Sequence, residues 1–305
     1  MIDKVALIIG YGFLSYLLLQ ILIILFSKLF LKKDISKCYG KGTWAIITGA
    51  SDGIGKGFAF TLAKKGFNLV LLARSESKLA QTQKEITQIY PSIVVKYIIA
   101  DFKNSTQPEF IEQIYKQIKD LDISLLINNV GVASIEPFCE TTESKIHELF
   151  VVNMAPQVFL SRKIIPLMLK REKRSGIVNV SSMTGTCPLP YDALYSSSKA
   201  FNDYLSRALS IECHKKIDII SLRPFYVSTK MVFNREAGIF TITPEECAEG
   251  CLQDLGTHHV TYGHYKHAIQ GFVWDIIPKW IVIRLMHIIG PIISKDYKES
   301  ISKFQ

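Results

Sequence analysis

A run of 23 residues without a charged side chain, Val5 to Ser27, lies at the N-terminus. As an α-helix rising about 1.5 Å per residue, this run crosses the ~30 Å hydrocarbon core of a bilayer with a little tilt. A cleaved signal peptide has a shorter apolar stretch and a small-residue cleavage site, whereas this run is followed by Lys28 and then by a Lys-Lys pair. The alternative is a buried core helix, which rarely stays uncharged over such a length. We therefore predict a membrane anchor over residues 1–32.

The charges that flank the run predict its orientation. On its N-terminal side the cations are Lys4 and the α-amino group, whereas lysines follow it at positions 28, 32, 33, 37 and 41. The positive-inside rule then places residues 32 onward in the cytosol. A reducing compartment also suits the six cysteines, which form no CxxC pair and are expected to be free thiols.

After a polar linker at 33–42, short β-rich runs alternate with amphipathic helical stretches. The runs expected to be strands are 43–48, 68–73, 94–99, 123–127, 176–180 and 217–222. Strands that are apolar on both faces and separated by helices predict an α/β fold, a doubly wound parallel sheet of the Rossmann-like type. No linker interrupts this region, so we predict one domain over 43–262, followed by a C-terminal segment over 263–305.

The turn after the first expected strand, Thr48 to Gly55, is rich in glycine. Glycines there permit a tight turn and let backbone N–H groups approach a pyrophosphate at the N-terminus of the following helix. A glycine trio alone is weak evidence, but its place between an apolar strand and an amphipathic helix favours dinucleotide binding. The candidate cofactor-binding residues in this turn are Gly49, Ser51, Asp52, Gly53, Ile54 and Gly55.

The end of the second expected strand indicates which dinucleotide is bound. An acidic residue at this point would accept hydrogen bonds from the ribose 2′-OH of NAD, whereas an arginine would meet the 2′-phosphate of NADP. The chain has Arg74 here and no carboxylate before Glu76. Arg74 could instead be a solvated strand-end residue. We predict NADPH as the cofactor, with Arg74 bidentate on the phosphate.

Tyr195 and Lys199 lie four residues apart at the start of an expected helix, which places both side chains on one face. A free phenol has a pKa near 10, and a neighbouring ammonium stabilises the phenolate and pulls that pKa toward working pH. General acid–base catalysis needs such tuning. Ser182 follows a strand end, where its hydroxyl can bond a carbonyl oxygen and hold it near the tyrosine.

Together these residues resemble the short-chain dehydrogenase/reductase family over about residues 43–260. The matching motifs are the TGxxxGIG turn at 48–55, Asp101 in Ala-Asp-Phe, the NNxG motif at 128–131 with Asn129, and the tetrad Asn153, Ser182, Tyr195 and Lys199.

The resemblance implies hydride transfer between a nicotinamide and a carbonyl or alcohol. Tyr195 would be the proton donor for reduction, and Ser182 would hold the carbonyl oxygen. Lys199 would bind the nicotinamide ribose and tune Tyr195, and Asn153 would help to hold a proton-relay water. Asp101 would contact the adenine.

One departure points to a branch of the family. The usual Pro-Gly after the sixth strand is here Pro224-Phe225. With the anchor and the tail, this variant looks like the membrane-bound very-long-chain 3-oxoacyl-CoA reductases, also described as 17β-hydroxysteroid dehydrogenase type 12-like proteins. By that analogy Val227 and Thr229 would contact the nicotinamide carboxamide, and residues 228–242 would form a mobile substrate lid.

The expected activity is therefore NADPH-dependent reduction of a lipid ketone, with long-chain 3-oxoacyl-CoA in fatty-acid elongation as the favoured substrate. A steroid or retinoid dehydrogenase that uses the same tetrad is one alternative, and a reductase-fold structural subunit of a membrane assembly is another. A net charge of +9 suits the CoA phosphates. The resemblance implies a location in the endoplasmic reticulum membrane. The C-terminus lacks a dilysine retrieval signal, so another organelle membrane is the alternative location. Other membrane proteins or a second copy of the chain are further candidate partners.

The remaining segments carry weaker signals. Residues 268–293 are apolar but contain charges and prolines, so we expect them to lie at the membrane interface and to line a substrate entrance; the alternative is a final helix packed on the domain. Histidines cluster at 258, 259, 264 and 267, but an expected strand over 260–265 would separate them, and we predict no metal site. Dispersed basic residues without interleaved aromatics predict no nucleic-acid binding.

Overall fold

The computed structural model describes residues 2–31, 33–232 and 235–304. Residues 1, 32 and 305 of the predicted anchor and tail, and residues 233–234 of the predicted lid, lie outside the described residues.

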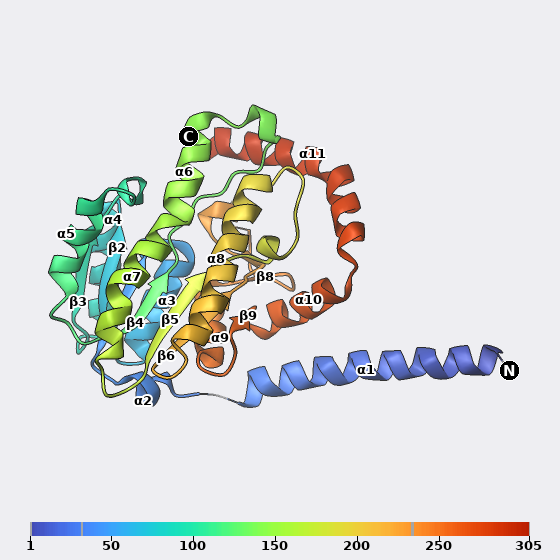
Figure 1. Ribbon diagram of the computed structural model, residues 1–305, viewed down its shortest axis with the longest axis horizontal. Coiled ribbons are helices and arrows are strands. Elements are labelled where there is room, and N and C mark those ends of the chain that lie inside the picture. The colour runs from blue at the N-terminus through green and yellow to red at the C-terminus, as the bar shows by residue number, and fades with distance from the viewer. Residues whose placement is uncertain (1, 32, 233–234, 305) are drawn as a thin grey trace.

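A seven-stranded parallel sheet forms the centre of the molecule, which confirms the predicted doubly wound α/β fold (Figure 1). Its strands stand in the order β3-β2-β1-β4-β5-β6-β9, so the strand order reverses between β1 and β4. The strands are β1 (Trp44–Thr48), β2 (Asn68–Ala73), β3 (Val95–Ile99), β4 (Ile123–Asn128), β5 (Ser175–Val180), β6 (Ile217–Leu222) and β9 (Val260–Thr261). A separate pair joins β7 (Tyr226–Val227) to β8 (Thr241–Ile242).

Apolar side chains pack on both faces of the sheet, as the uninterrupted apolar strands require. Ile47 of β1 faces one core, which it shares with Phe58 and Leu62, and the adjacent Ile46 faces the other core with Ile164. The helices that follow the strands cover these two faces and are α3 (Gly53–Lys64), α4 (Glu76–Ile89), α5 (Pro108–Ile118), α6 (Glu143–Asn153), α7 (Ala155–Leu169), α8 (Ala193–Glu212) and α9 (Pro244–Asp254).

The N-terminal helix α1 (Ile2–Phe30) projects away from this body (Figure 1). Within the described residues it is the one helix that is long and apolar enough to cross a membrane by itself. The short helix α2 (Ile35–Tyr39) connects it to β1. Lys28, near the C-terminal end of α1, forms an ion pair with Asp254, and Lys33 donates to the carbonyl oxygen of Leu255 at 2.7 Å. The end of the helix is therefore fixed to the globular body.

Two helices form the tail. Helices α10 (Tyr265–Ile276) and α11 (Lys279–Phe304) meet at 105°, so they could cross a membrane together only as one broken span. In Figure 1, α11 arcs from α10 toward α6. Ser294 and Tyr297 of α11 donate to the carbonyl oxygens of Ile135 (3.2 Å) and Ala133 (3.1 Å) in the loop after β4. The tail thus reaches the carboxyl edge of the sheet.

The prediction of a strand over 260–265 is wrong in length, because the strand in the structure is shorter. Strand β9 ends at Thr261, because Gly263 takes a left-handed φ of 79° and His264 then caps α10. His267 lies inside α10, where burial lowers its pKa to about 4 and keeps the imidazole neutral. Helix α9 begins with a capping box, in which Thr243 and Glu246 exchange hydrogen bonds of 2.9 and 3.1 Å.

Candidate active site

The glycine turn between β1 and α3 has the backbone that its sequence requires. Gly49 and Gly53 adopt φ values of 67° and 53°, which disfavour any residue with a Cβ. A Cβ on Gly55 would lie 2.2 Å from the carbonyl oxygen of Gly49, so two backbone segments touch here. Asn129 braces the turn by donating to the carbonyl oxygens of Thr48 (2.9 Å) and Gly49 (3.4 Å).

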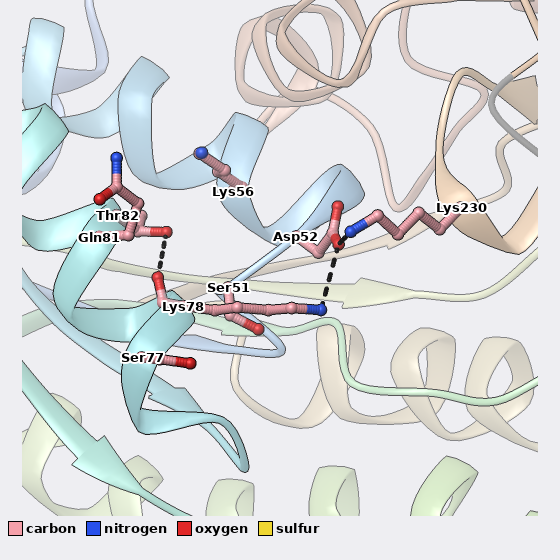
Figure 2. A pocket seen from close by; sticks show the side chains of 8 residues that line it. All are labelled: Ser51, Asp52, Lys56, Ser77, Lys78, Gln81, Thr82 and Lys230. Carbon is pink, nitrogen blue, oxygen red and sulfur yellow. Dashed lines mark hydrogen bonds and ion pairs between the residues drawn. The ribbon is translucent and has the colours of Figure 1, made fainter. Parts of the chain in front are cut away.

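Beside this turn lies a basic pocket of about 290 Å³, lined by Ser51, Asp52, Lys56, Ser77, Lys78, Gln81, Thr82 and Lys230 (Figure 2). Lys230 and Lys78 both extend toward Asp52, at 2.9 and 3.9 Å. Asp52 also caps α3 by accepting from the N–H of Gly53 at 2.8 Å. Burial alone would raise the pKa of Asp52, but the hydrogen bonds from Lys230 and Gly53 outweigh it and hold the pKa below its usual value. Lys56 is paired with Glu85 at 2.7 Å, so three lysines meet two carboxylates, and the remaining positive charge favours an anion in the pocket.

The other predicted cofactor contacts surround the same turn. Arg74 is exposed at the end of β2, with no ion pair within the part of the chain that the structure describes. Asp101 caps a short 3-10 helix by accepting from the N–H of Lys103 at 3.1 Å. Val227 is buried in β7. The Thr229 methyl group would lie 3.0 Å from a Cβ on Gly53, so the predicted lid begins directly over the turn. Ile54 is half-buried in the first turn of α3.

Tyr195 and Lys199 share one face at the start of α8, as their spacing predicts. The Lys199 ammonium lies 5.7 Å from the centroid of the Tyr195 ring and donates to the carbonyl oxygen of Val180 at 2.9 Å. Lys199 is 3% exposed, and this burial lowers its pKa to about 8. The amine therefore stays mainly charged at neutral pH.

The expected lowering of the Tyr195 pKa is wrong for this structure. Burial raises the pKa of the phenol above its ordinary value, the nearby carboxyl group of Asp192 raises it further, and Ser182 lowers it in part. Desolvation disfavours the phenolate more strongly than its polar neighbours stabilise it. The phenol is accordingly held as a protonated group.

Asn153 ends α6 and joins two parts of the site. Its side chain accepts from the N–H of Val132 at 2.8 Å, and it donates to the Val132 carbonyl oxygen and the Ser198 hydroxyl, both at 3.0 Å. Its own backbone carbonyl accepts from Asn202 at 2.9 Å. Asn153 thus ties the segment after β4 to α8, and its proton-relay role stays a prediction.

Ser182 follows β5, and its hydroxyl oxygen accepts from both the N–H and the hydroxyl of Thr184, at 3.2 and 3.1 Å. Sequence reasoning missed Thr184, Asp192 and the pocket lysines. Lys230 directly follows the predicted contact Thr229, which is a signal that could have found it. The only signal for Asp192 is its position three residues before Tyr195.

The comparisons with known proteins agree with this geometry. Residues 43–239 match the family model described as short chain dehydrogenase. The chain is 37% identical over 252 residues to the very-long-chain 3-oxoacyl-CoA reductase of Anas platyrhynchos, an alignment that covers 81% of this chain and 80% of that protein. It is 35% identical over 272 residues to the inactive hydroxysteroid dehydrogenase-like protein 1 of Homo sapiens, covering 87% and 81%.

Two solved structures share the fold. A 7β-hydroxysteroid dehydrogenase studied for its stereoselectivity superposes with a TM-score of 0.74 at 24% identity, over 84% of this chain and all of that chain. An alcohol dehydrogenase from Thermococcus sibiricus, complexed with 5-hydroxy-NADP, superposes with a TM-score of 0.63 at 26% identity, over 72% of this chain and 94% of that chain.

Proposed function

Because this chain belongs to the short-chain dehydrogenase family, we propose that it reduces a ketone on a lipid substrate to a hydroxyl with NADPH. The favoured substrate is a long-chain 3-oxoacyl-CoA. The observation that carries the proposal is the meeting of Ser182, Tyr195 and Lys199 at the carboxyl edge of the sheet, the edge where such sheets bind ligands. The name of the Anas platyrhynchos relative supports the acyl-CoA class.

The residues present fit the roles that ketone reduction needs. The Ser182 hydroxyl donates to the substrate carbonyl oxygen, and Tyr195 then delivers its phenolic proton to that oxygen. A raised pKa suits this direction, because it keeps the phenol protonated at neutral pH. The Lys199 ammonium lies beside the ring where the negative charge develops. A reduced nicotinamide, when bound, supplies the hydride.

The glycine turn fits a dinucleotide. The close approach of Gly55 to the Gly49 carbonyl gives the tight turn that a dinucleotide site needs, and a Cβ on Gly55 would force this turn open. The adjacent pocket, with Lys56, Lys78 and Lys230, suits a phosphate group, and this favours NADPH over NADH. The Thermococcus sibiricus structure, solved with an NADP derivative, also supports this choice.

Substitutions that remove the positive charges of Arg74 and Lys78 should raise KM for NADPH more than KM for NADH. In the double variant Arg74→Gln with Lys78→Gln, we expect KM for NADPH to rise about 10- to 100-fold, because charged hydrogen bonds are worth about 1.5–3 kcal/mol. KM for NADH should change less than about twofold. Lys84→Gln, an exposed lysine on the same helix, is the matched control and should change neither constant. Equal increases for both cofactors would contradict the binding of the 2′-phosphate by Arg74 and by the adjacent pocket.

We further propose that residues 1–32 anchor the protein in the endoplasmic reticulum membrane, or in another organelle membrane, with residues 33–305 on the cytosolic face. The exposed apolar surface of α1 supports the anchor. The tail supports an interfacial position, because Trp280, Leu285, Ile288 and Ile292 of α11 are exposed. A lipid ketone could then enter from the membrane beside α11.

Two other functions have support from the relatives. The 7β-hydroxysteroid dehydrogenase and the hydroxysteroid dehydrogenase-like relatives favour a steroid substrate, and the human relative called inactive favours a scaffold. Against the scaffold, this chain retains Ser182, Tyr195 and Lys199.

The relative turnover of ketone substrates by the purified 305-residue protein distinguishes these functions. We expect NADPH oxidation with a long-chain 3-oxoacyl-CoA to exceed that with a steroid 17-ketone by more than about tenfold in kcat/KM, since the stronger discriminating contacts should be to the acyl-CoA. A faster steroid reaction would assign the steroid function. Absence of turnover with every ketone, in a protein that still binds NADPH, would favour the scaffold.

A further inference from the structure

Asp192 is a buried carboxyl group for which the proposed mechanism has no use. It is 7% exposed at the N-cap of α8, and one of its two oxygens, Oδ1, has no hydrogen-bond partner in the described structure. Polar atoms buried in this way are costly, so each one calls for a reason. The preceding residue, Tyr191, has a φ of 66° and is the one non-glycine residue with positive φ in the described chain. Such strain gathers at functional sites.

The hydrogen bonds of Ser182 limit what its hydroxyl can do. A hydroxyl has one hydrogen and two lone pairs, and both lone pairs of Ser182 accept from Thr184, through its N–H and its hydroxyl. The one remaining function of the Ser182 hydroxyl is to donate its hydrogen. Its interaction with Tyr195, whose pKa it lowers, agrees with a donor that faces the reacting oxygen.

Thr184 in turn contacts Asp192, whose pKa it lowers through a side-chain hydrogen bond. Thr184 therefore connects the buried carboxyl to Ser182, and Ser182 reaches Tyr195. These hydrogen bonds run from Asp192 through Thr184 and Ser182 to Tyr195. Their direction depends on whether Asp192 or Tyr195, at the two ends, carries a proton.

We propose that the carboxyl group of Asp192, acting through Thr184, orients the Ser182 hydroxyl as a donor toward the carbonyl oxygen of the substrate. When Asp192 is protonated, it donates to the Thr184 hydroxyl, Thr184 donates to Ser182, and Ser182 donates to the ketone. When Asp192 is ionised, the Thr184 hydroxyl donates to the carboxylate instead of to Ser182. The Ser182 hydroxyl is then no longer held as a donor toward the substrate. Asp192 is thus a positioning residue, and its role rests on the proposed ketone reduction.

The surroundings set the pH at which this change occurs. Burial raises the pKa of Asp192 to about 8, and Thr184 lowers it in part. The titratable groups that face Asp192 are Tyr195 on its own helix and Tyr297 on α11, and Glu136 acts on Tyr297 from the loop after β4. Since the folded pKa is raised, the protonated form prevails at pH 7 and is lost as the pH rises through 8.

The test is the pH profile of ketone reduction at saturating NADPH. Lys199, whose ammonium the proposed mechanism uses, also has a pKa of about 8, so two groups lose their protons over this range. We expect wild-type kcat/KM to fall about 100-fold between pH 7 and pH 9, about tenfold for each group. Asp192→Asn keeps a donor at every pH, so only the tenfold fall from Lys199 should remain. Thr184→Val removes the connection, so it should show a lower kcat at pH 7 and the same tenfold fall. Glu136→Gln, which alters a nearby acid outside these hydrogen bonds, should keep the 100-fold fall.

Asp192→Asn or Thr184→Val with a 100-fold fall like that of wild type would overturn the inference, and Thr184→Val decides it if Asp192→Asn does not fold. Tyr195→Phe separates this inference from the proposed function. If Tyr195→Phe is inactive while the profile of Asp192→Asn matches wild type, only the role of Asp192 fails. If Tyr195→Phe is as active as wild type, the proposed mechanism fails, and the role of Asp192 fails with it.

Discussion

Replacing Tyr195 with Phe is expected to lower kcat for ketone reduction by about 10³-fold, within the range that a positioned general acid contributes. The substitution removes the proton donor but keeps the ring beside the Lys199 ammonium. The melting temperature and the affinity for NADPH should therefore stay close to wild type. Stopped-flow absorbance of NADPH at a saturating concentration of 3-oxoacyl-CoA measures the rate.

Tyr204→Phe is the matched control for this variant. Tyr204 lies on the same helix, is 73% exposed and contacts Arg207 at the surface. Its hydroxyl has no place in the site, so we expect the rate to be that of wild type. A Tyr195→Phe rate within tenfold of wild type would show that another group donates the proton.

Gly55→Ala should weaken NADPH binding by more than about 100-fold, because the new methyl group meets backbone that no side-chain movement can clear. The added Cβ would lie 2.2 Å from the Gly49 carbonyl oxygen and 2.6 Å from the Asn129 amide nitrogen. The clash can be relieved only if the turn opens. Overpacking of this kind costs about 1–3 kcal/mol or more, and the open turn would also lose its contacts with the dinucleotide. Quenching of protein fluorescence by NADPH measures the affinity.

Gly12→Ala controls for the loss of a glycine as such, since a Cβ on Gly12 of α1 meets nothing within 4 Å. Its NADPH affinity should equal that of wild type. If Gly55→Ala binds NADPH as tightly as Gly12→Ala does, the dinucleotide does not rest on this turn.

The fold could be predicted because its signals are local. Each long strand is an apolar run that is bounded by helices, and such runs tolerate only a sheet covered on both faces. The Tyr195–Lys199 pair could also be predicted, because helical periodicity alone places the two side chains on one face. By contrast, β9 was expected to be longer, since nothing local showed that Gly263 would adopt a left-handed φ.

The parts of the site that escaped prediction depend on distant contacts or on burial. Lys230 meets Asp52 across 178 positions of sequence, and Tyr297 reaches Ala133 through the path of α11. The pKa of Tyr195 was expected to fall because its charged neighbour could be read from the spacing, whereas its burial could not. Asp192 escaped notice for the same reason, because an acidic residue before a helix is ordinarily a solvated cap.

Transfer of deuterium from NADPH to the substrate tests the central claim most directly. The purified protein would be incubated with a long-chain 3-oxoacyl-CoA and NADPH carrying deuterium at both C4 positions of the nicotinamide, and the product would be analysed by mass spectrometry. We expect a 3-hydroxyacyl-CoA with one deuterium at C3, formed about 10³-fold more slowly by Tyr195→Phe than by wild type. A hydroxyl product without deuterium, or equal rates of formation of the labelled product by the two proteins, would contradict reduction by NADPH at this tyrosine.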